Sequence, residues 1–174
     1  NGDFTSIQEA IDAAAPGCII RIWAGTYDEQ IFINKSCSLI GNGSEYSRIE
    51  VVANQIMMIT ADEVTVSNLA IVNSTFSFGP YHYGIIVDGV NNCTIQDNEI
   101  SGNSLGVSIN NSRDVVVINN TLGNVWQGIE LNYCTNTSTG FNRIFYGGGF
   151  TITNDYYRSI IISYSNYNSV FNNS

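Results

Sequence analysis

Apolar and polar residues alternate along this chain in short runs that return every 22 residues. Three glycines mark the period, each followed by the same apolar pattern: Gly84, Gly106 and Gly128. Asn98, Asn120 and Asn142 form an asparagine column with the same spacing. Asn173 continues the column after a longer interval. A period of this length predicts a solenoid, in which each repeat buries its apolar face by stacking on its neighbours. Inward asparagines are expected to hydrogen-bond to one another and to the backbone.

Shorter elements are predicted ahead of the regular repeats. Residues 5–15 predict a helix, because Ser6 and Glu9 form a capping box and Pro16 follows the apolar stripe. We expect this helix to cover the first coil. Four runs rich in Ile and Val predict strands, with turns at residues such as Gly25: Ile19–Trp23, Gln30–Ile33, Cys37–Ile40 and Arg48–Val52.

The period is interrupted twice at the same place in the coil, after the asparagine column and before the glycine. The insertions are residues 75–83 and 146–158. On either side of them the alignment places Gln55 29 positions before Gly84, and Ser159 75 positions after it. The register therefore runs through the whole chain, and residues 1–174 are predicted to form one solenoid domain.

Composition excludes several classes of function. The net charge is −9 with six Lys and Arg, so no nucleic-acid partner is expected, and no apolar run is long enough to span a membrane.

The chain has four cysteines: Cys18, Cys37, Cys93 and Cys134. They form no C-x-x-C motif, and His82 is the single histidine, so neither a metal site nor a cofactor is predicted. Cys37 alternates in phase with Leu39 and is expected to point inward. Cys93 and Cys134 fall in different columns, which argues against a disulfide between them; pairing between chains stays open.

Eight Asn-x-Ser/Thr motifs are present in a chain with 23 asparagines: Asn34, Asn42, Asn73, Asn92, Asn110, Asn119, Asn136 and Asn172. A chain rich in Asn, Ser and Thr also generates such motifs by chance. Together with the low charge, they favour an exported, glycosylated protein. The chain opens at Asn1 without an initiator methionine, and it is expected to be a processed mature protein or an excised piece.

The segments FTSIQEAIDAAAPG, IWAGTY and NKSCSLIGNG resemble the start of right-handed parallel β-helix proteins of the pectin-lyase-like superfamily. Within it the chain resembles the carbohydrate-binding and sugar-hydrolase-associated repeats of archaeal surface proteins, which also occur in the periplasmic family that helps mature nitrous oxide reductase. This resemblance implies an all-β, right-handed parallel β-helix of about seven coils with a short N-terminal capping helix. It also implies an extracellular, cell-surface location.

Enzymes of this superfamily would need carboxylates gathered on one outer face. No column of the repeat stacks two acids on adjacent coils, and the signatures of the hydrolase branch are absent as a set. Glu130, Asp88 and Arg143 remain as weak catalytic candidates. The sequence thus favours a non-catalytic protein.

Aromatic residues of the insertions and the turn between them are expected along one edge of the solenoid: Phe76, Phe78, Tyr81, Tyr83, Trp126, Tyr156 and Tyr157. They would pack on one another, contact a protein, or bind a glycan. We favour a structural protein that joins copies of itself through this edge and the open terminal coil Ile160–Asn173, forming a surface layer, sheath or filament. The alternative is a carbohydrate-binding or carbohydrate-cleaving β-helix that uses the same edge.

Overall fold

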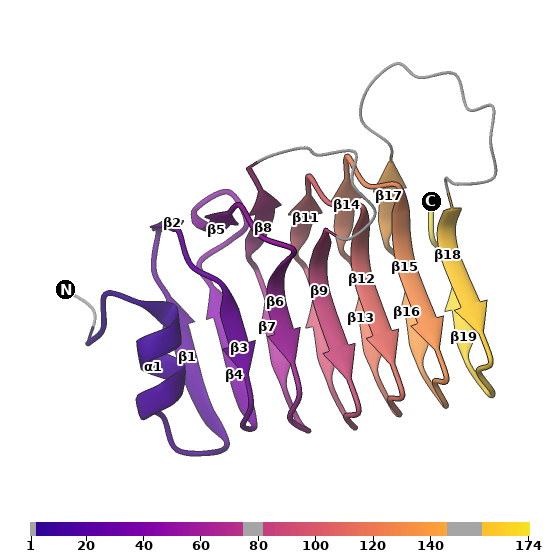
Figure 1. The fold of residues 1–174 in the computed structure, drawn as a ribbon, viewed down its shortest axis with the longest axis horizontal. Helices are drawn as coiled ribbons and strands as arrows, with labels where there is room; N and C mark the ends of the chain where they lie inside the picture. The colour runs from indigo at the N-terminus through magenta and orange to yellow at the C-terminus, as the bar shows by residue number, and fades with distance from the viewer. Residues whose placement is uncertain (1–2, 75–81, 146–157) are drawn as a thin grey trace.

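The chain winds through successive parallel strands that form three sheets (Figure 1). The computed structural model describes residues 3–74, 82–145 and 158–174. Consecutive strands belong in turn to sheets A, B and C, so three strands make one coil. Within the described residues six coils are complete and one further strand begins a seventh. The protein is an all-β, right-handed parallel β-helix, as predicted.

Each sheet contains one strand from every coil, in chain order along the axis. Sheet A contains β1 (Cys18–Ile22), β4 (Cys37–Gly41), β7 (Thr65–Ser67), β10 (Thr94–Gln96), β13 (Val116–Ile118), β16 (Ser138–Gly140) and β19 (Ser169–Phe171). Sheet B contains β2 (Gly25–Tyr27), β5 (Ser47–Val51), β8 (Ala70–Asn73), β11 (Glu99–Ser101), β14 (Thr121–Gly123) and β17 (Arg143–Phe145). Sheet C contains β3 (Ile31–Ile33), β6 (Gln55–Ile59), β9 (Tyr83–Asp88), β12 (Leu105–Asn110), β15 (Gln127–Asn132) and β18 (Arg158–Ser163).

The register between coils follows the sequence period, with two corrections. Ile95 pairs with Val117 22 positions later, and Ile129 pairs with Ile160 across the second insertion. Gln55, however, pairs with Tyr83 rather than Gly84, because the turn after β6 is one residue shorter than the later turns. Gly25, expected in a turn, begins the short strand β2.

The core is a stack of inward side chains in which like residues lie over like. One column of sheet C contains Ile59, Val87, Ile109 and Leu131, all fully buried. The glycine column also belongs to sheet C. Glycine is required there because a side chain and the backbone of the next coil lie too close to the Cα atom to leave room for a Cβ. A Cβ on Gly106 would lie 2.4 Å from Leu122 and 2.8 Å from the Gly128 carbonyl oxygen, too close for any side chain.

The asparagine column forms a hydrogen-bonded ladder at the corner between sheets A and B. The Asn98 amide nitrogen donates to Asn120 Oδ1 at 3.1 Å, Asn120 to Asn142 at 3.1 Å, and Asn142 to Asn173 at 2.9 Å. Each amide also donates to a strand carbonyl, as from Asn120 Nδ2 to Ile95 O at 2.9 Å. Leu69 occupies the column one coil earlier, and its backbone N–H donates to Asn98 Oδ1.

The helix α1 (Ile7–Ala13) lies across the first coil beside β1 and β3 (Figure 1). Ile7 and Ile11 are buried on the core, which is the cover expected from the apolar stripe. Ser6 Oγ accepts from Glu9 N at 3.2 Å, as the capping box predicts. The carboxylate of Glu29 accepts from the backbone N–H groups of Ile7 and Gln8, so a residue outside the helix completes its cap.

Candidate functional site

A polar groove opens on the outer face of sheet B. Its volume is about 410 Å³, and it is lined by Ser44, Asp97, Asn98, Glu99, Asn119, Thr121, Arg143 and Phe145. The register of β11, β14 and β17 places Glu99, Thr121 and Arg143 side by side on three successive coils. The groove is thus built by the repeat itself, because each coil contributes the residue at one position.

Turn residues complete the groove beside these strands. Asp97 and Asn119 have φ angles of 55° and 56°, the left-handed conformation that Asn and Asp adopt most readily after Gly. This conformation turns the chain from sheet A into sheet B, with Asp97 and Asn119 exposed and the ladder residues Asn98 and Asn120 buried.

The charged groups of the groove are not neutralised by one another or by other described residues. The side chains of Asp97, Glu99 and Arg143 make no hydrogen bond or ion pair there, and Arg143 lies over the ring of Phe145 at 5.4 Å. Unpaired acceptors, an unpaired guanidinium and an aromatic face can together bind a polyhydroxylated molecule. The side chains of Asp97 and Glu99 are both exposed.

The structure separates the three catalytic candidates. Glu130 lies on β15 and Asp88 at the end of β9, with β12 between these strands. Asp88 accepts a hydrogen bond from Asn111 Nδ2 at 3.1 Å. Arg143 belongs to sheet B and faces a different groove, with Asp97 and Glu99. Asp97 and Glu99 lie two residues apart on one coil. A comparison of acids on adjacent coils therefore does not find them from the sequence.

Most of the predicted aromatic edge lies outside the described residues: Phe76, Phe78, Tyr81, Tyr156 and Tyr157. Tyr83 begins β9 and Trp126 precedes β15, both half-buried at the corner between sheets B and C where the insertions enter. Two aromatic contacts lie at other corners: Tyr133 stacks on Tyr164 at 4.9 Å, and Phe141 meets Phe171 edge to face at 5.4 Å.

The last two strands, β18 and β19, expose apolar side chains whose partners one coil earlier are buried. Ile162 on β18 is 44% exposed, whereas its partner Leu131 is fully buried. Val170 on β19 is 46% exposed, and its partner Thr139 is fully buried. At these two positions no described residue covers the inward apolar side chain.

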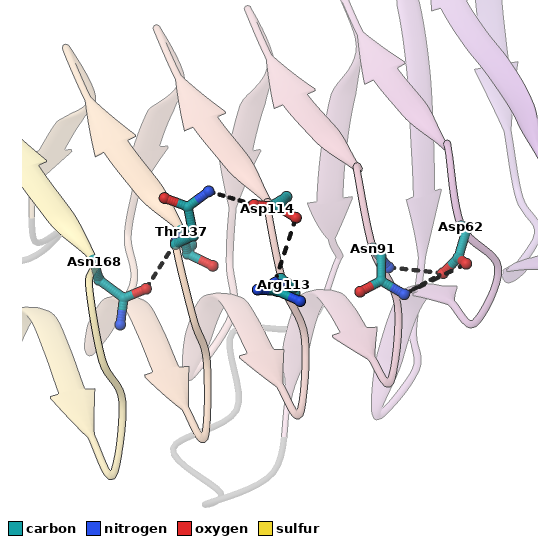
Figure 2. A network of polar contacts seen from close by, with 7 residues as sticks. Asp62, Asn91, Arg113, Asp114, Thr137 and Asn168 are labelled. Carbon is teal, nitrogen blue, oxygen red and sulfur yellow. Dashed lines mark hydrogen bonds and ion pairs between the residues drawn. The ribbon is translucent and has the colours of Figure 1, made fainter.

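The corner between sheets C and A carries a solvent-facing polar network (Figure 2). Asn91 N donates to Asp62 Oδ1 at 2.7 Å, and Thr137 N donates to Asn168 Oδ1 at 2.8 Å. Arg113 and Asp114 form an ion pair at 3.7 Å. The Asn91–Asp62 and Thr137–Asn168 bonds join neighbouring coils, and the Arg113–Asp114 pair lies within one coil, so the corner is explained by the fold alone.

Six of the eight glycosylation motifs present an exposed asparagine, Asn110 is half-buried, and Asn73 is 4% exposed. Asn73 Nδ2 donates to Ala53 O at 2.8 Å. Four of the exposed asparagines have φ angles between 48° and 58°: Asn92, Asn119, Asn136 and Asn172. Because asparagine tolerates this conformation, the turns by themselves account for part of the excess of motifs.

The four cysteines are free thiols in two different environments. Cys93 Sγ donates to Ala61 O at 3.4 Å, and Cys134 Sγ donates to Ile109 O at 3.2 Å. Cys18 and Cys37 instead occupy paired positions on β1 and β4. Burial, together with the nearby Cys18, raises the pKa of the Cys37 thiol to about 11.

Residues 15–174 match the model of the family described as "Periplasmic copper-binding protein (NosD)". The chain belongs to this family. A cell surface glycoprotein of Methanothermus fervidus is 34% identical over 99 residues, which is 56% of this chain and 16% of that protein. The chain thus spans about a sixth of the length of this relative.

Solved structures of low identity share the fold. An alginate lyase from Paenibacillus superposes with a TM-score of 0.69 at 16% identity, covering 96% of this chain and 72% of the lyase. The pectin methylesterase of Yersinia enterocolitica has a TM-score of 0.63 at 15% identity, covering 95% of this chain and 66% of the esterase. At this identity the likeness shows the β-helix and no activity.

The family match and the surface relative confirm the predicted location outside the cytoplasm, at the cell surface. Across the part of the chain that the structure describes, no helix has the length and apolar character needed to span a membrane.

The family description raises the question of copper. The described residues contain no cluster of three or more His, Cys, Asp or Glu side chains suited to a metal ion. Met57 is buried in the core, and His82 Nδ1 lies 3.1 Å from Ala53 O. Cys18 and Cys37 are the one pair of soft ligands at paired positions of neighbouring strands in the described chain, and a thiolate pair fits Cu(I) better than any harder ion.

Proposed function

We propose that the chain is a non-catalytic structural module of a cell-surface protein that joins a second copy of itself through the uncovered face of its last coil. The supporting observation is the exposure of Ile162 and Val170, whose partners one coil earlier, Leu131 and Thr139, are fully buried. Another β-helix coil has the matching face, because each coil of this chain already covers the one before it.

The cap at the other end limits the kind of assembly. Helix α1 lies over β1 and β3 and buries Ile7 and Ile11 there, so the first coil is partly covered. A contact between two last coils is isologous and closes as a dimer. Growth into a layer, sheath or filament would require a second contact, for which the aromatic edge at the insertions is the candidate.

Light scattering on the chain eluting from a sizing column tests this proposal. We expect a dimer for the unaltered chain and a monomer for Ile162→Lys, because a charge at the contact loses its water on association. Val52→Lys is the matched control, since Val52 is 61% exposed and follows β5 of an earlier coil. A monomeric unaltered chain at high micromolar concentration would contradict the proposal.

A second function, saccharide binding, is favoured by the groove on sheet B. Exposed carboxylates accept hydrogen bonds from sugar hydroxyls, the Arg143 guanidinium donates to them, and Phe145 offers an apolar ring face. With two carboxylates against one guanidinium, the groove is expected to prefer neutral sugars to uronates.

Calorimetric titration with neutral and uronate oligosaccharides tests this function. We expect binding of a neutral ligand that falls in both Glu99→Gln and Arg143→Gln and persists in Glu130→Gln, whose side chain lies on sheet C. Loss of binding in Glu130→Gln alone would place the site on sheet C and contradict the groove.

A further inference from the structure

Tyrosines occupy left-handed turn positions at the corner between sheets C and A. Tyr164 and Tyr167 have φ angles of 50° and 56°, and Tyr133, one coil before Tyr164, has 54°. In the two coils before Tyr133 the same column contains Gly89 and Asn111. Glycine and asparagine adopt this conformation readily, whereas a tyrosine there costs stability. The turn itself does not require aromatic side chains, so their presence at a strained position indicates a contact.

The three tyrosine side chains are exposed and partly stacked. Tyr133, Tyr164 and Tyr167 are 60%, 78% and 88% exposed. The rings of Tyr133 and Tyr164 stack with their centroids 4.9 Å apart and their planes 9° apart, a distance close to the spacing of about 4.8 Å between neighbouring strands. The stack therefore follows the solenoid axis. The second face of the Tyr164 ring points away from Tyr133, toward the side on which no described coil follows.

The coil that contains β18 and β19 carries no charge. Residues 159–174 include no Asp, Glu, Lys or Arg, although the whole chain has a net charge of −9. Earlier coils place charged side chains at the same corner, among them Arg113 and Asp114. A second copy of the chain has the same negative charge, and like charges that face each other across a contact oppose association. An uncharged aromatic surface on this acidic chain therefore fits a second copy.

We propose that two copies meet around a two-fold axis at the corner between sheets C and A, with Asn166 on the axis and Tyr164 and Tyr167 against the opposing turn. This inference rests on the proposed contact between last coils and names where that contact lies. The corner joins β18 of sheet C to β19 of sheet A, at the end of the solenoid opposite α1 (Figure 1). An axis through it exchanges sheets C and A, so that β18 of each copy lies on β19 of the other. An axis through another corner would place one of these strands over sheet B, where their coil has no described strand.

Strand direction and register agree with this axis. The chain runs toward the corner in β18 and away from it in β19, so β18 of one copy is antiparallel to β19 of the other. Their free edges can then exchange backbone hydrogen bonds. Ile162 precedes Asn166 by four residues, and Val170 follows it by four. The axis therefore places Ile162 of one copy opposite Val170 of the other, which covers both exposed apolar side chains.

Tyr167→Asn separates the contact from the fold. Tyr167 makes no ring contact with the described residues, so the substitution loses no packing within the chain and relieves the left-handed strain. In the Ile162→Lys background, expected to be monomeric, it should raise the melting temperature by about 2–4 °C. In the otherwise unaltered chain it should raise the Kd of the dimer about tenfold, measured by analytical ultracentrifugation. Tyr46→Asn is the matched control, since Tyr46 is 55% exposed beside β5, and it should leave the Kd unchanged.

Cysteine cross-linking locates the axis. A residue on a two-fold axis meets its own copy, so Asn166→Cys is expected to form a disulfide-linked dimer under mild oxidation, visible on a non-reducing gel. Ser174→Cys is the control: Ser174 is exposed on the same coil, beyond the corner between sheets A and B, and should give no linked dimer.

The outcomes distinguish this inference from the proposed function. A dimer that is linked by Ser174→Cys and not by Asn166→Cys, or a Kd unchanged in Tyr167→Asn, would overturn the axis and leave the last-coil dimer in place. A monomeric unaltered chain at high micromolar concentration would remove the proposed function and the axis together.

Discussion

At the scale of single residues, the asparagine ladder shows how a polar group is accommodated in the core. Asn120 is 1% exposed, and its Oδ1 accepts from both Asn98 N and Asn98 Nδ2. Its own amide donates to Ile95 O, Ile118 O and Asn142 Oδ1. The side chain is thus fully bonded, and its neighbours depend on it.

Asn120→Ala is expected to lower the free energy of unfolding by more than about 2 kcal/mol, because each buried group left without a partner costs about 1–3 kcal/mol. Urea denaturation followed by circular dichroism measures the change. Asn34→Ala is the control: Asn34 is exposed and makes no hydrogen bond with the described residues, so a change within about 0.5 kcal/mol is expected. Equal losses in the two variants would show that the ladder adds no stability.

At the scale of elements, the N-terminus of α1 is capped by a residue of the turn between β2 and β3. Glu29 accepts from Ser6 Oγ at 2.7 Å, Ile7 N at 2.8 Å and Gln8 N at 3.0 Å. A carboxylate at a helix N-terminus satisfies free N–H groups and complements the helix dipole. The helix is therefore attached to the coil that it covers.

Glu29→Ala is expected to cost about 0.5–2 kcal/mol of stability, the usual effect of losing a helix cap. Hydrogen exchange should accelerate at the amides of Ile7 and Gln8, which lose their acceptor. Glu45→Ala, at an exposed residue without a hydrogen bond in the described chain, is the matched control. Unchanged exchange at Ile7 and Gln8 would contradict the role of Glu29.

At the scale of the whole molecule, the coils decide which glycosylation motifs can be used. We expect glycopeptide mapping of the protein from its source to find glycans on exposed asparagines, such as Asn34 and Asn42, and none on Asn73. Asn73 is buried and bonded to Ala53, and a glycan there would have to displace the coil. A glycan on Asn73 would contradict the described packing of β8, and a fully unmodified chain would contradict the prediction of a glycoprotein.

The sequence alone determined the solenoid, its register and its cap. Like residues stack on like in a β-helix, so a column of the sequence is also a column in space, and Asn98, Asn120 and Asn142 could be placed before any coordinates. The same logic placed Ser159 across an insertion. The predicted partner of Gln55 was wrong by one residue, because the apolar pattern does not show the length of a turn.

Only the tertiary structure decided which side chains meet between columns and across sheets. Asp97 and Glu99 join Arg143 in one groove because a left-handed turn sets their directions, and Glu29 reaches α1 because the coil brings it under the helix. Cys18 and Cys37 are 19 residues apart in a part of the chain without the regular period, so their pairing appears only when β1 and β4 lie side by side. The repeat determines which residues of successive coils stack on one another along the solenoid axis. Contacts between residues of different sheets or corners depend on turn geometry, which the apolar pattern does not encode.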